Sequence, residues 1–210
     1  MSMSERELSF LTRFIVESDA IENITADPQL VGTQLKARWR KGHVGTMLLL
    51  EKEAKKKNLF VSKNLICQVH GLITKEQHTK IGGPKLKPEW IGRYRLVNVS
   101  IGGRMSPSPI LVPSLMKSWV SCVVKWQKVY SQYLPSANLQ QIAVFHYEYE
   151  RIHPFVDGNG RSGRVFVYYL MRYCEIKPFV FTSDDKHSTY YQCFNNSEEM
   201  CKYFETKEIQ

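Results

Sequence analysis

The fold and the chemistry of this chain follow from one stretch, His153-Pro154-Phe155-Val156-Asp157-Gly158-Asn159-Gly160-Arg161-Ser162-Gly163-Arg164. It combines a base, a carboxylate, two glycines around an asparagine, and two arginines. Glycines let backbone N–H groups converge on an anion, and the N-terminus of a following helix attracts negative charge. Arginines three residues apart lie on one side of a helical turn and can reach successive phosphates, and a carboxylate suits Mg²⁺. The stretch predicts a nucleotide-phosphate site with a histidine at its edge.

Two other motifs fit this stretch less well. Gly158-x-Gly160-x-x-Gly163 matches a dinucleotide-binding fingerprint, with Asp184 about twenty residues further on. That fingerprint must follow a strand, whereas the residues before it keep helical spacing. A calcium-binding EF-hand loop also fails, because Arg161 replaces a ligand and Tyr168 stands where Glu is required. A solvated glycine-rich loop would explain a lone arginine or histidine, but not the combined spacing.

Helical periodicity surrounds the stretch. Apolar residues recur at helical spacing from Leu139 to His153, where Pro154 must end the helix. The following segment, 165–169, would also pass for a strand on propensity alone. We predict helices from the capping box at Ser4 to about 24, over 30–57 with an interruption at Gly42 and Gly45, over 63 to about 72 closed by Gly71, from 113 to about 133, and over 162–174 and 184–194.

A small β-hairpin interrupts this pattern. Residues 95–101 alternate apolar and polar side chains, which is typical of a strand. Gly102-Gly103 follows as a turn, and we expect 110–112 to form the returning strand. A loop is expected at 81–84, which contains two glycines and a proline. The fold class is therefore all-α with one hairpin.

Composition bounds the function. With 43% hydrophobic residues, 210 residues can bury a full core. The apolar runs 44–50 and 165–171 are far shorter than the ~20 residues of a membrane span, and the first seven residues do not resemble a signal peptide. The five cysteines include no Cys-x-x-Cys, which argues against a disulfide framework or a zinc ribbon. We expect no membrane partner and a cytoplasmic location, although export into another cell stays open.

The net charge of +9 is uneven along the chain. Residues 36–95 hold 15 basic and 4 acidic residues, so this band carries more positive charge than the whole. A basic band can bind nucleic acid, but no nucleic-acid motif accompanies it. A solvated helix face is the simpler interpretation, and nucleic acid is an unlikely partner.

The stretch resembles the Fic-domain signature, His-x-Phe-x-Asp/Glu-Gly-Asn-Gly-Arg-x-x-Arg, at every defined position. His146 and Ile152 fit as well, and residues 92–95 look like the approach to the family's flap. The resemblance covers roughly 18–191. It implies a Fic fold, a helical bundle with a small β-hairpin flap beside the active site, and AMPylation, the transfer of AMP from ATP to a Tyr, Thr or Ser hydroxyl of a target protein.

The resemblance also implies a role for each position. His153 would be the general base, Asp157 would hold Mg²⁺ between the α- and β-phosphates, and Phe155 would be a buried anchor. Gly160 stands where the family's kinase-like branch has a bulky charged residue, which favours nucleotidyl transfer. The anion cradle would be Gly158, Asn159 and Gly160, with Arg161 and Arg164 on the outer phosphates. The target-docking flap would be Val99, Ser100, Ile101, Gly102, Gly103, Arg104 and Met105.

A second motif lies far from the first in sequence. Ser18-Asp19-Ala20-Ile21-Glu22-Asn23 resembles the family's inhibitory motif, Ser/Thr-x-x-x-Glu-Gly/Asn. Ser18 and Glu22 are four residues apart, so both can point at one partner from a single helix face. The resemblance implies an inhibitory helix over 1–27 and a Fic domain over 28–210, with its core at about 60–195. Ser18, Glu22 and Asn23 would be inhibitory, with Glu22 blocking Arg164.

Several alternatives stay open. A phosphate cradle does not read the base, so transfer of UMP or phosphocholine is one alternative, and removal of AMP with Glu22 activating a water is another. Self-modification and a homodimer are further arrangements of partners. A non-enzymatic alternative is a basic nucleic-acid-binding module whose Fic-like site is idle.

Overall fold

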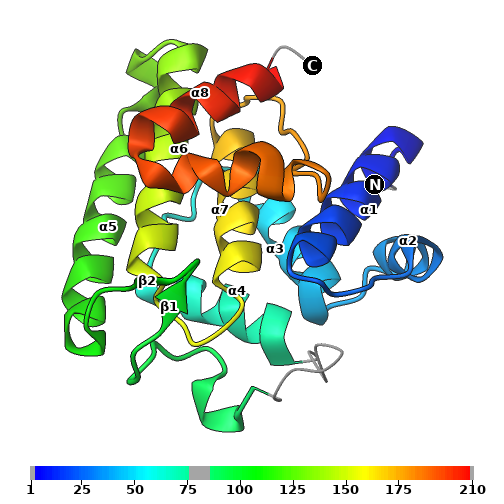
Figure 1. Ribbon diagram of the computed structural model, residues 1–210. Helices are drawn as coiled ribbons and strands as arrows, with labels where there is room; N and C mark the ends of the chain where they lie inside the picture. The colour runs from blue at the N-terminus through cyan, green and yellow to red at the C-terminus, as the bar shows by residue number, and fades with distance from the viewer. Residues whose placement is uncertain (1–2, 76–85, 209–210) are drawn as a thin grey trace.

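Helix α7 (Asn159–Tyr173) runs through the middle of the computed structural model, which describes residues 3–75 and 86–208 (Figure 1). Thirteen of its fifteen residues are buried, and a helix that is buried on all sides forms the centre of a core. Residues 165–169 are therefore helical despite their strand propensity, because burial on every face outweighs the preference of β-branched and aromatic residues.

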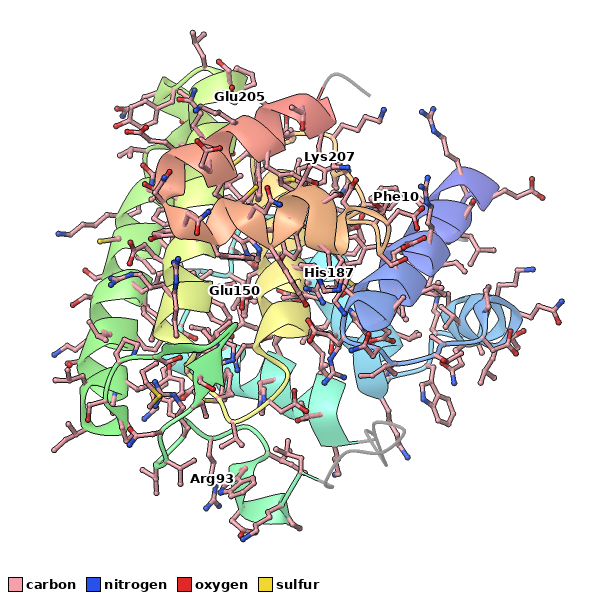
Figure 2. The ribbon with its side chains drawn as sticks, viewed as in Figure 1. Phe10, Arg93, Glu150, His187, Glu205 and Lys207 are labelled. Carbon is pink, nitrogen blue, oxygen red and sulfur yellow. The ribbon has the colours of Figure 1, made fainter. Side chains whose placement is uncertain are left out.

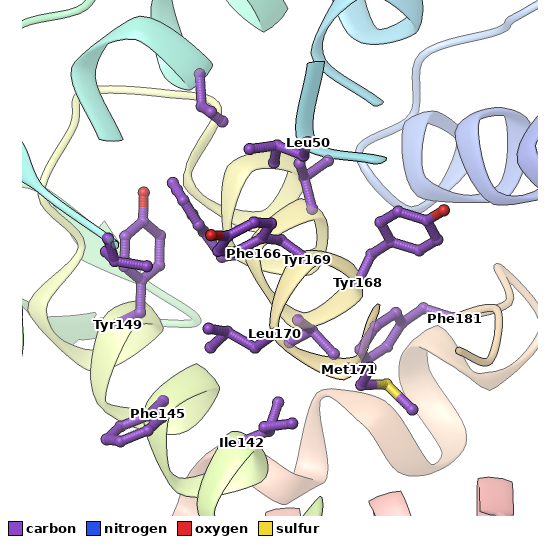
Figure 3. Close-up of a cluster of buried hydrophobic side chains, with 14 of the residues drawn as sticks. Leu50, Ile142, Phe145, Tyr149, Phe166, Tyr168, Tyr169, Leu170, Met171 and Phe181 are labelled. Atoms are coloured by element: carbon purple, nitrogen blue, oxygen red, sulfur yellow. The ribbon is translucent and has the colours of Figure 1, made fainter. Parts of the chain in front are cut away.

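The other helices pack around α7. Helix α6 (Pro135–Ile152) and α8 (Ser197–Glu208) cover one side, with α5 (Val112–Gln127) beyond α6. Helices α3 (Gly42–Lys56) and α4 (Lys63–Lys75) cover another side (Figure 1). Figure 3 shows the apolar core where these layers meet, with Phe145, Phe166 and Phe181 among the side chains that fill it.

The N-terminal helix α1 (Glu5–Ile21) lies beside α7 and α3, with α2 (Pro28–Lys36) outside it (Figure 1). Its predicted capping box is confirmed: Ser4 Oγ accepts from the Glu7 N–H at 3.2 Å, and Glu7 accepts from the Ser4 N–H at 3.2 Å. Leu11, Phe14 and Ile15 are buried. The apolar face of α1 thus docks the C-terminal end of the helix against the first turns of α7.

The hairpin is shorter than predicted. Strand β1 (Ser100–Ile101) pairs with β2 (Arg104–Met105) in antiparallel register. Residues 95–99 are not a strand, and the returning strand expected at 110–112 is wrong: 109–111 form a 3-10 turn that leads into α5. Pro107 and Pro109 have no N–H for a ladder, and the Arg95 N–H donates to the Pro154 carbonyl instead of to a strand.

Other helix boundaries also differ from the sequence prediction. The break expected at Gly42 and Gly45 lies earlier, at 37–41, and Gly45 stays inside α3, where a Cβ would come within 2.4 Å of the Arg40 backbone. Gly71 does not close its helix but lies within α4, packed on Gly92. The helix predicted over 184–194 is two short turns, Lys186–Tyr190 and Gln192–Asn195, and α8 was not predicted. The remaining short 3-10 turns are Pro88–Trp90 and Tyr130–Gln132.

The loop predicted at 81–84 lies outside the described residues. None of the helices in 3–75 and 86–208 has both the length and the apolar character that crossing a bilayer requires. All five cysteines are free thiols.

Candidate active site

The signature stretch forms the connection from α6 to α7. Gly158 is the residue before α7 and has a φ of 78°, a left-handed conformation that favours glycine. A Cβ there would come within 2.7 Å of Thr74. The first backbone N–H groups of α7, from Asn159 onward, have no carbonyl partner within the helix, and the helix dipole makes this end positive. This is the geometry of an anion site.

Asn159 braces the loop. Its side-chain amide accepts from the Phe155 N–H and donates to the Phe155 carbonyl, both at 2.9 Å. Phe155 is fully buried, which confirms its predicted place as an anchor. The part of Asn159 that can serve an anion cradle is consequently its backbone N–H, because its amide group is bonded within the loop.

His70 of α4 supports the same loop and was not found from the sequence. Its Nδ1 accepts from the Gly92 N–H at 2.9 Å, so the ring hydrogen is on Nε2, which donates to the Asp157 carbonyl at 2.8 Å. The ring stacks on Phe155 with centroids 3.7 Å apart. Burial lowers the pKa of His70 to about 4, so the ring acts as a neutral brace.

His153 ends α6 in a left-handed conformation, with φ 50° and ψ 65°. Its Nδ1 lies 3.3 Å from the Glu150 carbonyl oxygen. A carbonyl only accepts, so Nδ1 carries the hydrogen and Nε2 holds the lone pair. Burial lowers the pKa of His153 to about 4, Glu150 and Glu22 oppose this change, and Arg95 adds to it. The imidazole is therefore neutral near pH 7, as a base must be.

Asp157 is half-buried in the loop just before the N-terminus of α7, and its Oδ1 accepts from the Gly158 N–H at 2.7 Å. Within the described residues no group of three or more His, Cys, Asp or Glu side chains could hold a metal by itself. Mg²⁺ commonly binds through one or two carboxylates together with substrate phosphates. A single carboxylate beside an anion site fits a metal that arrives with a nucleotide.

Arg164, from the second turn of α7, is held by the end of α1. Its Nε donates to Ser18 Oγ at 3.0 Å, and its Nη2 donates to the Ser18 carbonyl at 2.7 Å and to Glu22 Oε1 at 2.9 Å. The guanidinium is buried, whereas Glu22 keeps 19% of its side chain exposed. The sequence expectation that Ser18 and Glu22 face one partner agrees with these contacts.

Glu22 also lies over the first turn of α7. A Cβ built on Gly160 would lie 2.1 Å from Glu22 Oε1 and 2.9 Å from Arg164 Nη1. A side chain at position 160 would collide with the carboxylate, so the glycine is what lets Glu22 approach the helix end. Glu22 thus sets a negative charge at the anion site described above.

The rest of the Ser18–Asn23 segment is anchored nearby. Asn23 has a φ of 58°, and its side-chain oxygen accepts from Lys186 Nζ at 3.0 Å. Asp19 Oδ1 lies 3.1 Å from His43 Nδ1. Burial would raise the pKa of Asp19, but His43 and then Arg161 lower it below its ordinary value. Arg161 is 3% exposed and lies close enough to Asp19 of α1 to lower the pKa of that carboxyl.

A buried polar cluster lies behind Arg164. His146 Nε2 is 2.8 Å from the Tyr190 hydroxyl, and the Arg164 guanidinium lies over the Tyr190 ring. Glu150 (Figure 2) also belongs to it, and its Oε1 would meet a Cβ at Gly163 within 2.2 Å. Burial raises the pKa of Glu150 to about 8. Behind Arg164 the cluster therefore holds aromatic and neutral groups, and the carboxylate that pairs with the guanidinium is Glu22.

Comparison with models of protein families matches residues 60–171 to the Fic/DOC family. The match covers more than half of the chain and includes the whole signature stretch. The chain belongs to the Fic/DOC family.

Curated relatives carry the same family name. The chain is 28% identical over 130 residues to "Protein adenylyltransferase Fic" of Culex quinquefasciatus, which is 62% of this chain and 24% of that protein. It is 29% identical over 117 residues to the Drosophila melanogaster protein of that name, 55% of this chain and 22% of that protein. The chain therefore spans about a quarter of the length of the curated relatives it matches.

Solved structures show the same fold. A Fic-domain-containing signaling protein from Bacteroides thetaiotaomicron superposes with a TM-score of 0.72 over 96% of this chain and 84% of that chain, at 20% identity. Fic-1 from C. elegans gives a TM-score of 0.64 over 99% of this chain and 61% of that chain, at 18% identity. The expected all-helical Fic fold with a small hairpin is thus confirmed.

The flap of this Fic chain, Val99–Met105, lies beside the signature loop (Figure 1). Only two residues pair on each strand, and the Val99 carbonyl accepts from the Ser106 N–H. Ile101 and Met105 are exposed on it, Met105 to 67%. At the turn, Gly102 and Gly103 have φ values of 53° and 81°, which favour glycine. Arg104 donates to Asn195 at 3.3 Å.

Proposed function

We propose that this Fic chain is an autoinhibited protein adenylyltransferase, which transfers AMP from ATP to a Tyr, Thr or Ser hydroxyl of a target protein. Membership of the Fic/DOC family and relatives named protein adenylyltransferase support the transferase class. The observation that carries the proposal is the Glu22 carboxylate, which lies on Arg164 and over Gly160 at the anion end of α7. A carboxylate there imitates the group that the site is built to receive.

In the active state, the N-terminus of α7 would bind the phosphates of ATP. Backbone N–H groups from Gly158 to Gly160 and the dipole of α7 would hold the inner phosphates. Arg161 and Arg164 would then hold the outer phosphates by charge-assisted hydrogen bonds. Phosphoryl-type transfer depends mainly on positioning and charge neutralisation, which these groups supply.

Asp157 would hold Mg²⁺ that arrives with the nucleotide. When bound, the metal would neutralise charge that develops on the phosphates.

His153 would be the general base. Its Nε2 holds the lone pair because Nδ1–H faces the Glu150 carbonyl. As the target hydroxyl oxygen attacks the α-phosphorus, Nε2 would take the hydroxyl proton, and the bond to the departing pyrophosphate would break. The pKa of about 4 keeps the ring unprotonated at neutral pH, although it makes the ring a weaker base than a histidine that titrates near the operating pH.

Glu22 would inhibit by competing with the γ-phosphate for Arg164. Like charges repel strongly where water is excluded, so ATP would bind with its α-phosphate out of line with the incoming hydroxyl. A misplacement of about 1 Å can cost roughly a hundredfold in rate. Ser18 and Asn23 would hold the end of α1 in this blocking position.

The target would dock on the flap. Strands β1 and β2 are short and exposed, and the free edge of such a hairpin can pair with an extended peptide. The pairing would bring a hydroxyl side chain toward His153. The target is a protein partner, and the label found on the chain itself would measure self-modification.

Labelling with nucleotides tests this function. Wild type, Glu22→Gly, and Glu22→Gly combined with His153→Ala would be incubated with a lysate and either α-labelled or γ-labelled ATP. We expect α-label on protein from Glu22→Gly at roughly a hundredfold the wild-type rate and none from the double variant. With γ-labelled ATP, we expect the same background from the lysate's own kinases for all three proteins.

Further measurements on the same variants distinguish the alternative functions. Labelled CTP and UTP would report transfer of another nucleotide. A folded Glu22→Gly protein that transfers no α-label from any nucleotide would refute the transferase proposal, and binding of an oligonucleotide instead would favour the nucleic-acid module.

A further inference from the structure

Arg95 is an almost fully buried cation, 1% exposed, and its bonds go to backbone carbonyls. Its Nε donates to the His153 carbonyl at 2.7 Å, and its Nη2 donates to the Ile152 carbonyl at 3.3 Å. Its other bonds reach the flap: Nη1 donates to the Val97 carbonyl at 3.0 Å, and Nη2 to the Pro107 carbonyl at 2.6 Å. One guanidinium therefore joins the end of α6 to both stems of the flap.

Burying this charge is unfavourable, and burial lowers the pKa of Arg95 below its ordinary value. Arginine nevertheless stays protonated in proteins. The compensation comes from the C-terminus of α6, where the last carbonyls lack helical partners and the dipole is negative. A neutral side chain of similar size could fill the same space, so packing alone does not explain why a charged residue is buried at position 95.

His153 needs support because of its backbone. A left-handed conformation is strained in a residue other than glycine. The His153 N–H donates to the Tyr149 carbonyl, its own carbonyl accepts from Arg95, and the next carbonyl, of Pro154, accepts from the Arg95 N–H. Arg95 therefore fixes the peptide units that direct the imidazole.

The flap stems are fixed by the same side chain. Val97 precedes β1 and Pro107 follows β2, so their carbonyls mark the two points where the hairpin leaves the body of the protein. Both accept from Arg95, and the same guanidinium donates to the His153 carbonyl. The distance from a peptide on the flap to the His153 ring thus depends on Arg95.

We propose that Arg95 is a positioning residue of this enzyme, which sets the His153 base and the target-docking flap in register with each other. The inference rests on the proposed function, since it gives His153 and the flap the roles assigned above. A shift of about 1 Å between hydroxyl and base would lower the rate roughly a hundredfold, with no change at the phosphate cradle.

Arg95 also affects the charge state of the base. The groups facing His153 are Glu150 on α6, Glu22 at the end of α1, Asp157 in the signature loop, and Arg95. Arg95 disfavours the imidazolium and lowers the pKa of His153, whereas Glu22 raises it. Removing the cation would therefore raise this pKa.

The experiment uses the Glu22→Gly chain as parent, with MgATP at saturation and α-labelled ATP as the probe. Arg95→Lys keeps the charge but loses the planar fork, and Arg95→Met loses both. We expect the first-order labelling rate to fall roughly a hundredfold in each, with ATP affinity by calorimetry within twofold of the parent. Arg93→Lys is the control, because Arg93 is exposed two residues away (Figure 2).

The pH profile separates positioning from charge. Arg95→Met should lose more of its rate between pH 7.5 and 5.5 than Arg95→Lys does, because only Met removes the cation. A rate within threefold of the parent for both variants would overturn the inference.

Pro107→Gly gives an independent test in a folded background if the Arg95 variants do not fold. It loosens one flap stem without touching the core, and we expect a roughly tenfold lower labelling rate at unchanged ATP affinity. An unchanged rate in Pro107→Gly would also overturn the inference. If the Glu22→Gly parent itself transfers no label, the proposed function fails, which is a different result from a parent that labels and variants that label equally well.

Discussion

The two sides of the signature loop differ in how they are covered. On the α1 side, Arg164 is buried and makes three hydrogen bonds to Ser18 and Glu22. On the flap side, only two residues pair on each strand. Apolar side chains there face solvent, with Leu96 exposed to 86% and Met105 to 67%.

This difference separates two kinds of control. The covered side is where phosphates would bind, and the chain covers it with its own helix, so release of α1 would regulate the enzyme. The open side is where a target would bind, and nothing in the described residues covers it, so its surface would determine which protein is modified. Regulation and target choice would then depend on different residues.

The largest expected effect is on the covered side. Arg164→Ala should not mimic Glu22→Gly, because it removes the phosphate ligand along with the block. Combined with Glu22→Gly, it should lower the labelling rate roughly a hundredfold from the Glu22→Gly level. The rate of α-label incorporation at fixed MgATP measures this.

Arg172→Ala is the matched control, since Arg172 lies on the same helix but pairs with Glu51 at 2.8 Å, away from the site. We expect it to change stability and not labelling. If the double variant labels as fast as Glu22→Gly, then Arg164 holds no phosphate and Glu22 inhibits by another route.

Ser18→Ala should release part of the block. It removes the bond from Arg164 Nε to Ser18 Oγ, whereas the Ser18 carbonyl and Glu22 still accept from Nη2. A hydrogen bond to a charged group contributes about 1.5 kcal/mol at the low end of its usual range, so the labelling rate should rise roughly tenfold and stay below that of Glu22→Gly. Ser9→Ala, at an exposed position on α1, is the control. A rate equal to wild type would contradict the role of Ser18.

What the sequence predicted well depended on short-range patterns. The capping box at Ser4 and the end of α6 at His153 are determined by neighbours within a turn, and both are present. The returning strand failed because prolines and the Arg95 N–H, not periodicity, decide where backbone hydrogen bonds go. Gly71 was predicted to end its helix, but it lies inside α4 and packs against Gly92. A contact with a residue this far along the chain is not visible in the local sequence.

The contrast between short-range patterns and long-range contacts applies to the candidate site as well. The signature supplied the residues around the anion end of α7, and the structure brings them together. The roles of His70 and Arg95 could not be predicted, because they act through backbone atoms 87 and 58 residues away, respectively. No motif spans such separations. Their contribution becomes visible only when the fold brings α4 and the flap stems against the loop.

On the open side the expected effect is smaller and confined to the target. Met105→Asp and Ile101→Asp place a charge on the flap, where an extended segment would pack. We expect several-fold less α-label on lysate proteins from the Glu22→Gly parent, with ATP affinity and the melting temperature unchanged, because both side chains are exposed. Leu30→Asp, on an exposed apolar residue of α2, is the control. A loss of ATP affinity in the flap variants would show that the flap also affects nucleotide binding, which would contradict the division between a phosphate side and a target side.

His153 lies between the two sides, and they act on its pKa in opposite directions: Glu22 raises it and Arg95 lowers it. The net value of about 4 predicts a flat pH profile. An ordinary histidine with a pKa near 6.5 would be only about a quarter neutral at pH 6, so its rate would fall roughly fourfold between pH 8 and pH 6. With a pKa of about 4, nearly all of the base is neutral at both values. The labelling rate of Glu22→Gly at saturating MgATP should therefore agree within about 1.5-fold across this interval, and calorimetry at each pH would confirm that the nucleotide stays bound. Because Glu22→Gly removes a group that raises the pKa, the variant should keep its rate to a lower pH than a partly released protein such as Ser18→Ala. A fourfold loss at pH 6 would mean that the base is solvated like a free histidine, and that neither side of the loop controls it.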